Sequence, residues 1–187
     1  MMGKTRSYKP RNGASLSLLR VRPRPGLRTQ GFLSAGGKTI RVALGRAGVR
    51  ALKREGDGGT PLGTFRPVRL WWRADRLPRP RTLLPVRRIG PGDAWCEDPG
   101  DRRYNRAFRR SANEPGDRLR REDGLYDLII EINHNARPRV ARLGSAVFVH
   151  VARPAFGPTA GCVALLRNEL LQVLSRIGPK TRIKIHI

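Results

Sequence analysis

The sequence predicts a mainly β fold with one helix near the C-terminus. Several short segments alternate apolar with polar residues, which is the pattern of a half-buried strand. The 21 glycines and 15 prolines among 187 residues indicate many turns, and so favour short strands over a helical bundle. A chain of this length suits one domain, and because its two cysteines offer no disulfide framework, the hydrophobic core must hold the fold.

The N-terminal half is predicted to begin with a disordered basic tail at residues 1–13, followed by a single domain at 14–187. A glycine-rich loop spans residues 45–63. Pro67 indicates an edge strand or a bulge, because proline cannot donate a ladder hydrogen bond. The predicted strands of this half, in order, are residues 16–21, 30–33, 39–44, 64–72 and 84–89.

Residues 90–125 form an insertion with little periodicity, rich in Gly, Pro, Asp and Arg. Nine of the 14 acidic residues lie between Asp93 and Asp127. A loop of this length in a compact domain is either functional or flexible. Part of it is expected to fold back onto the domain through four residues, Trp95, Cys96, Tyr104 and Asn105.

The C-terminal part is predicted to contain strands at residues 126–132 and 145–151, both with apolar β-branched centres. A helix follows, with Asn168 as its N-cap and Glu169 at the positive end of its dipole. The spacing of Leu170, Leu171, Leu174 and Ile177 gives the helix one apolar face. The helix stops at Gly178–Pro179, and residues 181–187 alternate as a last strand.

The charge of the chain is extreme, with 39 Lys and Arg against 14 Asp and Glu, a net +25. No acidic residue precedes Glu55. Such a positive charge either attracts anionic polymers non-specifically or results only from arginines that the surface tolerates. Zinc-finger spacing and RNP motifs are absent from the sequence, so no specific nucleic-acid partner is predicted. No apolar run approaches 18 residues, so no membrane span is predicted, and the first 13 residues lack the apolar region of a secretory signal.

The candidate chemistry lies in residues 150–162, where His150 ends an apolar strand and Cys162 follows a loop with two prolines and two glycines. A rigid base and a returning loop can bring a thiol nucleophile within hydrogen-bond reach. A neighbouring imidazolium and nearby arginines favour the thiolate. Gly161 leaves room for a substrate carbonyl and allows a strained turn whose N–H groups line an oxyanion hole. The alternative for Cys162 is a small buried apolar residue.

Other candidates carry weaker patterns. His134 follows a strong strand and either flanks the active site or is a hydrogen-bonded turn histidine. Cys96 is predicted to be a loop thiol with no catalytic role. Neither C-x-x-C nor H-x-x-x-H spacing occurs, so no metal site and no cofactor are predicted. Thr60 and Pro61 are expected to shape a turn.

Two motifs resemble those of the L,D-transpeptidases, the YkuD-type domain. The first is His150 followed by Thr159-Ala160-Gly161-Cys162-Val163, and the second is Thr60-Pro61-Leu62-Gly63-Thr64-Phe65. The C-terminal helix and final strand also fit. Together the matches cover roughly residues 39–72 and 126–187. The resemblance implies a mixed β-sandwich of this family.

The resemblance also implies roles. Cys162 forms an acyl-enzyme thioester, and His150 acts as general base and then acid. Backbone N–H groups around Gly161 and Cys162, next to Thr159, form the oxyanion site, and a backbone carbonyl often completes the triad. The implied substrate is a peptidoglycan stem peptide that loses a terminal D-alanine to an acceptor amine, while transfer to water would make the enzyme a carboxypeptidase. The family implies the cell envelope, and a cytoplasmic location stays open.

Three departures from the family pattern concern substrate positioning. Ala164 stands where arginine is usual, Ala160 stands where His or Asn is usual, and only twelve positions separate His150 from Cys162. Arg153 is either the replacement cation that binds substrate or a solvated loop arginine. The alternative function is a basic protein that binds an anionic polymer, nucleic acid or cell wall, with an inert Cys162.

Overall fold

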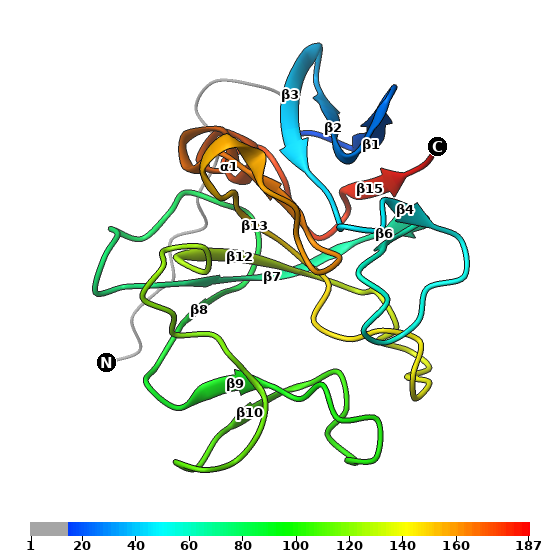
Figure 1. The fold of residues 1–187 in the computed structure, drawn as a ribbon. Helices are drawn as coiled ribbons and strands as arrows, with labels where there is room; N and C mark the ends of the chain where they lie inside the picture. Colours follow the sequence, from blue (N-terminus) through cyan, green and yellow to red (C-terminus); the bar gives the residue numbers. More distant parts are fainter. Residues whose placement is uncertain (1–14) are drawn as a thin grey trace.

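A computed structural model describes residues 15–187, so the basic tail predicted at residues 1–13 lies outside the described residues. The main feature is a ten-stranded mixed sheet of order β6-β15-β1-β2-β3-β14-β13-β12-β7-β8. The sheet curls around the core, with β6 and β15 at one end and β7 and β8 at the other (Figure 1). The mainly β fold with a single α-helix is confirmed.

The strands of the N-terminal half follow the predicted order, with β4 and β5 added as a two-stranded parallel pair. Their bounds are β1 (Leu18–Arg24), β2 (Leu27–Ala35), β3 (Lys38–Ala43), β4 (Val49–Arg50), β5 (Thr60–Pro61), β6 (Gly63–Phe65), β7 (Pro67–Trp72) and β8 (Val86–Arg88). β7 lies between β12 and β8 rather than at an edge. The register shifts where Pro67 faces Ile132, so Pro67 marks a bulge, the second of its two predicted positions.

The second half contains the strands nearest the candidate site. Its elements are β9 (Asp93–Trp95), β10 (Ala107–Arg109), β11 (Asp117–Arg118), β12 (Leu128–Ile132), β13 (Phe148–Val151), the 3₁₀ turn η1 (Pro154–Phe156), β14 (Val163–Leu165), α1 (Arg167–Leu174) and β15 (Arg182–Ile185). No helix formed by residues 15–187 is long and apolar enough to cross a membrane.

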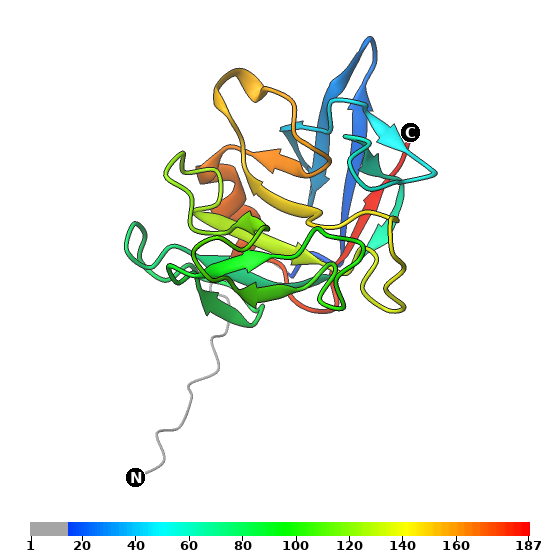
Figure 2. The ribbon, with the colours of Figure 1, turned by 60° about the horizontal axis from the view of Figure 1, so that its bottom comes forward.

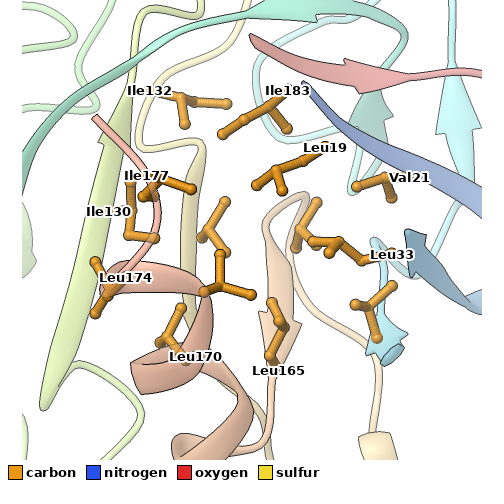
Figure 3. Close-up of a cluster of buried hydrophobic side chains, with 14 of the residues drawn as sticks. Leu19, Val21, Leu33, Ile130, Ile132, Leu165, Leu170, Leu174, Ile177 and Ile183 are labelled. Carbon is orange, nitrogen blue, oxygen red and sulfur yellow. The ribbon is translucent and has the colours of Figure 1, made fainter. Parts of the chain in front are cut away.

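The core fills the inside of the curled sheet and is closed by α1 (Figure 3). Alternation on β1 explains the arrangement, because Leu19 and Val21 are buried while Arg20 between them is exposed. Leu170 and Leu174 bury the apolar face of α1 against the sheet. The predicted N-cap at Asn168 is wrong: the helix begins at Arg167 with Leu166 as the cap residue, and the Asn168 side chain instead accepts a bond from the next N–H.

The central pair β13 and β14 determines where the reactive residues lie. The two strands are parallel, with His150 opposite Ala164. The loop at residues 152–162, with η1 inside it, connects them in place of the helix that usually makes a parallel connection. Because Cys162 directly precedes β14, this topology brings it beside the start of β13.

The insertion at residues 90–125 forms a separate antiparallel sheet of order β10-β9-β11. Figure 2 shows its green strands along the lower side of the main sheet. The predicted return onto the domain is confirmed, since Trp95, Cys96, Tyr104 and Asn105 are all buried. The Trp95 ring packs edge-on against Phe148 of β13, with ring centroids 4.9 Å apart.

Asn105 connects the insertion to the domain through four hydrogen bonds. Its Oδ1 accepts from Trp95 Nε1 (2.9 Å) and from the Ala146 N–H (3.2 Å). Its Nδ2 donates to the carbonyls of His134 (3.0 Å) and Asn135 (2.9 Å). Because every polar atom of this buried amide is satisfied, the network fixes where the insertion lies.

Replacing Asn105 by alanine is therefore expected to lower the free energy of unfolding by about 2–4 kcal/mol, since buried partners are left unsatisfied. Asn105 also has a φ of +54°, a conformation that asparagine tolerates better than alanine. Chemical denaturation measures the change. Asn113→Ala, at an exposed position of the same insertion, is the control. Equal unfolding free energies for the two variants would contradict the role of Asn105.

Candidate active site

A pocket of about 260 Å³ opens over the start of β14. Its wall comes from the glycine-rich loop after β3, from the turn at residues 157–162 and from the insertion. The structure brings five of the residues singled out from the sequence into this one pocket: Cys162, His150, Gly161, Thr159 and Arg153.

The Cys162 thiol is buried at the base of the pocket, with 6% of the residue exposed. Its Sγ donates to the Ala146 carbonyl at 3.2 Å and accepts from the Phe148 N–H at 3.3 Å. Burial is the main cause that raises the pKa of this thiol to about 12. The Phe148 N–H and Lys53 act in the opposite direction, and the carboxylates of Asp117 and Glu97 act with burial. The resting residue is therefore a neutral thiol at physiological pH.

His150 presents one particular ring nitrogen to the pocket. Its Nδ1 lies 2.8 Å from the Val151 carbonyl oxygen. Since a carbonyl can only accept, Nδ1 carries the proton, and in the neutral ring Nε2 keeps its lone pair. The Tyr126 ring packs against the imidazole, with centroids 5.3 Å apart. Burial lowers the pKa of His150 to about 4, so the ring is neutral at pH 7.

The resting pair differs from the sequence-based expectation of a thiolate beside an imidazolium. Both pKa shifts have burial as their main cause, and both favour the neutral form. Within residues 15–187 no hydrogen bond joins Sγ to the imidazole, because the thiol donates to Ala146 instead. A neutral base and a neutral thiol in one pocket suit proton transfer during nucleophilic attack rather than a preformed ion pair.

The turn before Cys162 is closed by the Thr159 side chain. The Thr159 hydroxyl donates to the Cys162 carbonyl at 2.7 Å and accepts from the Gly161 N–H at 3.1 Å. The Gly161 N–H is therefore already bonded within the turn. Gly161 has a φ of +144°, and a Cβ there would lie 2.8 Å from the Gly59 carbonyl oxygen, so only glycine fits.

The two sequence motifs meet in space beneath this turn. Thr159 exchanges backbone bonds with the chain after β3, donating to Leu44 (2.9 Å) and accepting from Arg46 (2.9 Å). Thr60 is fully buried and its hydroxyl accepts from the Gly45 N–H at 2.8 Å. Thr60 therefore shapes the glycine-rich loop, as predicted, and does not line the pocket.

An acidic wall, formed by Glu55, Glu97 and Asp117, lies across the pocket and was not predicted from the sequence. Glu97 is an exposed residue, but partial burial of its carboxyl, together with the negative charges of Asp117 and Glu55, raises its pKa to about 7. Burial raises the pKa of Asp117, although Tyr126 donates to it at 2.8 Å. The feature of the sequence that could have revealed this wall is the concentration of nine acidic residues in residues 93–127 of a strongly basic chain.

The remaining candidates lie elsewhere. His134 lines a separate groove, packs on Phe65 and places its Nε2 3.1 Å from the Leu143 carbonyl. Cys96 is buried, which raises the pKa of its thiol, and it is not part of the pocket wall. Within the described part of the chain, no group of three or more His, Cys, Asp or Glu side chains could hold a metal ion.

Comparison with known proteins found a family model that matches most of the chain. The family model YkuD, described as an L,D-transpeptidase catalytic domain, matches residues 29–185. The match includes the glycine-rich loop, the insertion and residues 150–162. No curated protein and no solved structure matches the chain.

Proposed function

We propose, because the chain belongs to the YkuD family of L,D-transpeptidase catalytic domains, that it transfers peptidoglycan stem peptides through a thioester on Cys162. The observation that carries the proposal is the pair of adjacent parallel strands that brings the Cys162 thiol and the His150 ring into one pocket. A nucleophile and an oriented base in one concave site are the minimum for acyl transfer.

In acylation, His150 Nε2 takes the thiol proton while Sγ attacks the carbonyl that precedes the terminal D-alanine. The Cys162 N–H stabilises the oxyanion of the tetrahedral intermediate. The C–N bond then breaks, and the imidazolium returns its proton to the departing amine, which leaves a thioester. The Val151 carbonyl holds the Nδ1–H and so stabilises the transient imidazolium.

In deacylation, an acceptor amine attacks the thioester and gives one proton to His150. The C–S bond breaks, and the imidazolium returns that proton to Sγ, which restores the neutral pair. Water in place of the amine gives hydrolysis and a carboxypeptidase. Both routes use the same two side chains, so the choice depends on which acceptor occupies the pocket.

The pocket offers complementary charges to a zwitterionic peptide end. The acidic wall suits the ammonium group of an acceptor, while Arg46, Arg121 and Arg153 suit carboxylates. Arg121 is already paired with Asp123 at 2.5 Å, and Arg153 is exposed at the rim. We therefore assign Arg153 to the substrate carboxylate.

Glu97→Gln is expected to raise the KM for the acceptor amine about fivefold, which corresponds to about 1 kcal/mol for a partly exposed ion pair. Because the pKa of Glu97 is about 7, the carboxylate predominates at pH 8 and the acid at pH 6. The effect should therefore be larger at pH 8. Steady-state transfer with varied acceptor measures it, and Asp98→Asn, an exposed neighbour outside the pocket wall, is the control. A pH-independent KM ratio would contradict this role.

The function is tested by incubating the protein with tetrapeptide muropeptides and analysing the products by mass. The expected products are cross-linked dimers, or tripeptides if water is the acceptor. In a separate incubation with a carbapenem, a β-lactam that acylates reactive thiols, an adduct is expected on Cys162. Absence of both products and of the adduct, from folded protein, would overturn the proposal. We also propose the cell envelope as the site of the reaction, which the mature N-terminus from fractionated cells would test.

A further inference from the structure

Lys53 is a buried lysine in the wall of the pocket that contains Cys162. It lies in the loop between β4 and β5, and only 9% of it is exposed. A buried ammonium is costly unless it is paired, so its position requires a partner and suggests a use. Among the lysines and arginines in the described wall of this pocket, Lys53 is the buried one.

The Lys53 ammonium is held by its own loop. Its Nζ donates to Asp57 Oδ1 at 2.7 Å and to the Arg54 carbonyl at 2.5 Å. The same Asp57 oxygen accepts from the Gly59 N–H at 2.7 Å, and its other oxygen accepts from the Arg54 N–H. One carboxylate thus fixes the lysine and the loop together. An ammonium has three donors, so one N–H remains for other use.

The Lys53 side chain packs against the turn that carries the nucleophile. Its Cε lies 3.7 Å from the place a Cβ would occupy on Gly161. Gly59, tied to Asp57, places its carbonyl 2.8 Å from the same point. The Lys53–Asp57 pair therefore supports Gly161 from two directions, immediately before Cys162.

The charged groups of the pocket act on the Cys162 sulfur in opposite directions. Asp117 and Glu97 disfavour a negative charge on Cys162, whereas Lys53 favours it. Position 164, two residues after Cys162, is a buried alanine packed with Ala43, Ala152 and Phe156. That position therefore supplies no cation, and Lys53 is the buried ammonium of the pocket wall.

We infer that Lys53 is a positioning residue of acyl transfer, supplying fixed positive charge beside the Cys162 sulfur and the oxyanion while its side chain supports Gly161. The inference rests on the proposed function. Lys53 transfers no proton in either step, because the proton moves between Sγ, His150 and the leaving or entering amine. Its contribution is electrostatic, and it acts on kcat more than on KM.

The test is alkylation of Cys162 by iodoacetamide, followed at the Cys162 peptide by mass spectrometry from pH 5 to pH 10. Lys53→Met is expected to slow alkylation about tenfold at pH 8, because a tenfold smaller thiolate fraction displaces the rising rate profile by about one unit toward higher pH. Lys53→Arg should restore most of the rate. Arg54→Met, which makes the same charge change at an exposed position of the same loop, should match the unmodified protein.

Folding is controlled by thermal unfolding of both variants, because Lys53→Met leaves the Asp57 carboxylate without its cation. Lys53→Arg keeps a cation beside Asp57, so its alkylation rate tests the inference even where Lys53→Met is less stable. Superimposable pH profiles for Lys53→Met and the unmodified protein would overturn the inference, as would a folded Lys53→Arg that reacts no faster than Lys53→Met. An unmodified protein whose Cys162 reacts with neither iodoacetamide nor carbapenem would overturn the proposed function itself.

Discussion

Cys162→Ser is expected to lower stem-peptide transfer by about 10³-fold or more and to abolish the carbapenem adduct. A serine hydroxyl has a much higher pKa than a thiol and forms an ester in place of the thioester. Product formation by mass spectrometry, with intact-protein mass for the adduct, measures both effects.

The serine variant is expected to keep its fold, because its hydroxyl can replace both hydrogen bonds of the thiol, to Ala146 and from Phe148. Thermal unfolding checks this. Cys96→Ser changes the other free thiol, which lies outside the pocket wall, and should retain transfer. A serine variant with normal transfer would show that Cys162 is not the nucleophile.

His150→Gln is expected to lower the acylation rate by about 10²–10⁴-fold, which is the usual contribution of a general base. In the unmodified protein, the acylation rate should have its full value above about pH 5. It should fall as the pH drops through about 4, where the imidazole becomes protonated. No basic limb is expected below pH 10, because the thiol is neutral throughout that range. Carbapenem acylation rates across pH measure the profile, which should lose its acid limb in the variant.

The same histidine makes folding depend on pH. An unfolded histidine takes up a proton below about pH 6.5, whereas in the folded chain His150 does so only near pH 4. The unfolded state binds more protons between these values, so stability rises with pH from about 4 to about 6.5. His150→Gln should flatten that part of the curve in denaturation experiments. An unchanged curve would mean that His150 is not buried in its neutral form.

Much of the fold could be predicted because its signals are local. The apolar residues of 16–21 and the apolar β-branched centre of 126–132 identified β1 and β12, and helical spacing identified α1. The reactive pair was also predictable, because each of its members has a local pattern. One is a histidine that ends an apolar strand, and the other is a cysteine directly after a glycine in a turn.

The rest depends on contacts between distant segments. β14 is only three residues long and pairs with β3 and β13, so no local period marks it. The insertion forms its sheet through Trp95 and Asn105 contacts with β13 and the loops beside it. The neutral state of Cys162 and His150 comes from burial by those same segments, which is why the sequence indicated an ion pair instead.

The insertion's three-stranded sheet shares no strand with the ten-stranded sheet in residues 15–187. It can therefore open as a unit while β13 and β14 stay paired. In hydrogen-exchange terms, amides of β9–β11 should exchange through this sub-global opening, whereas amides of β13 and β14 should exchange only on global unfolding. Glu97 and Asp117 of the acidic wall would thus separate from the thiol before the domain unfolds, and a ligand bound to both would slow exchange in β9–β11 first.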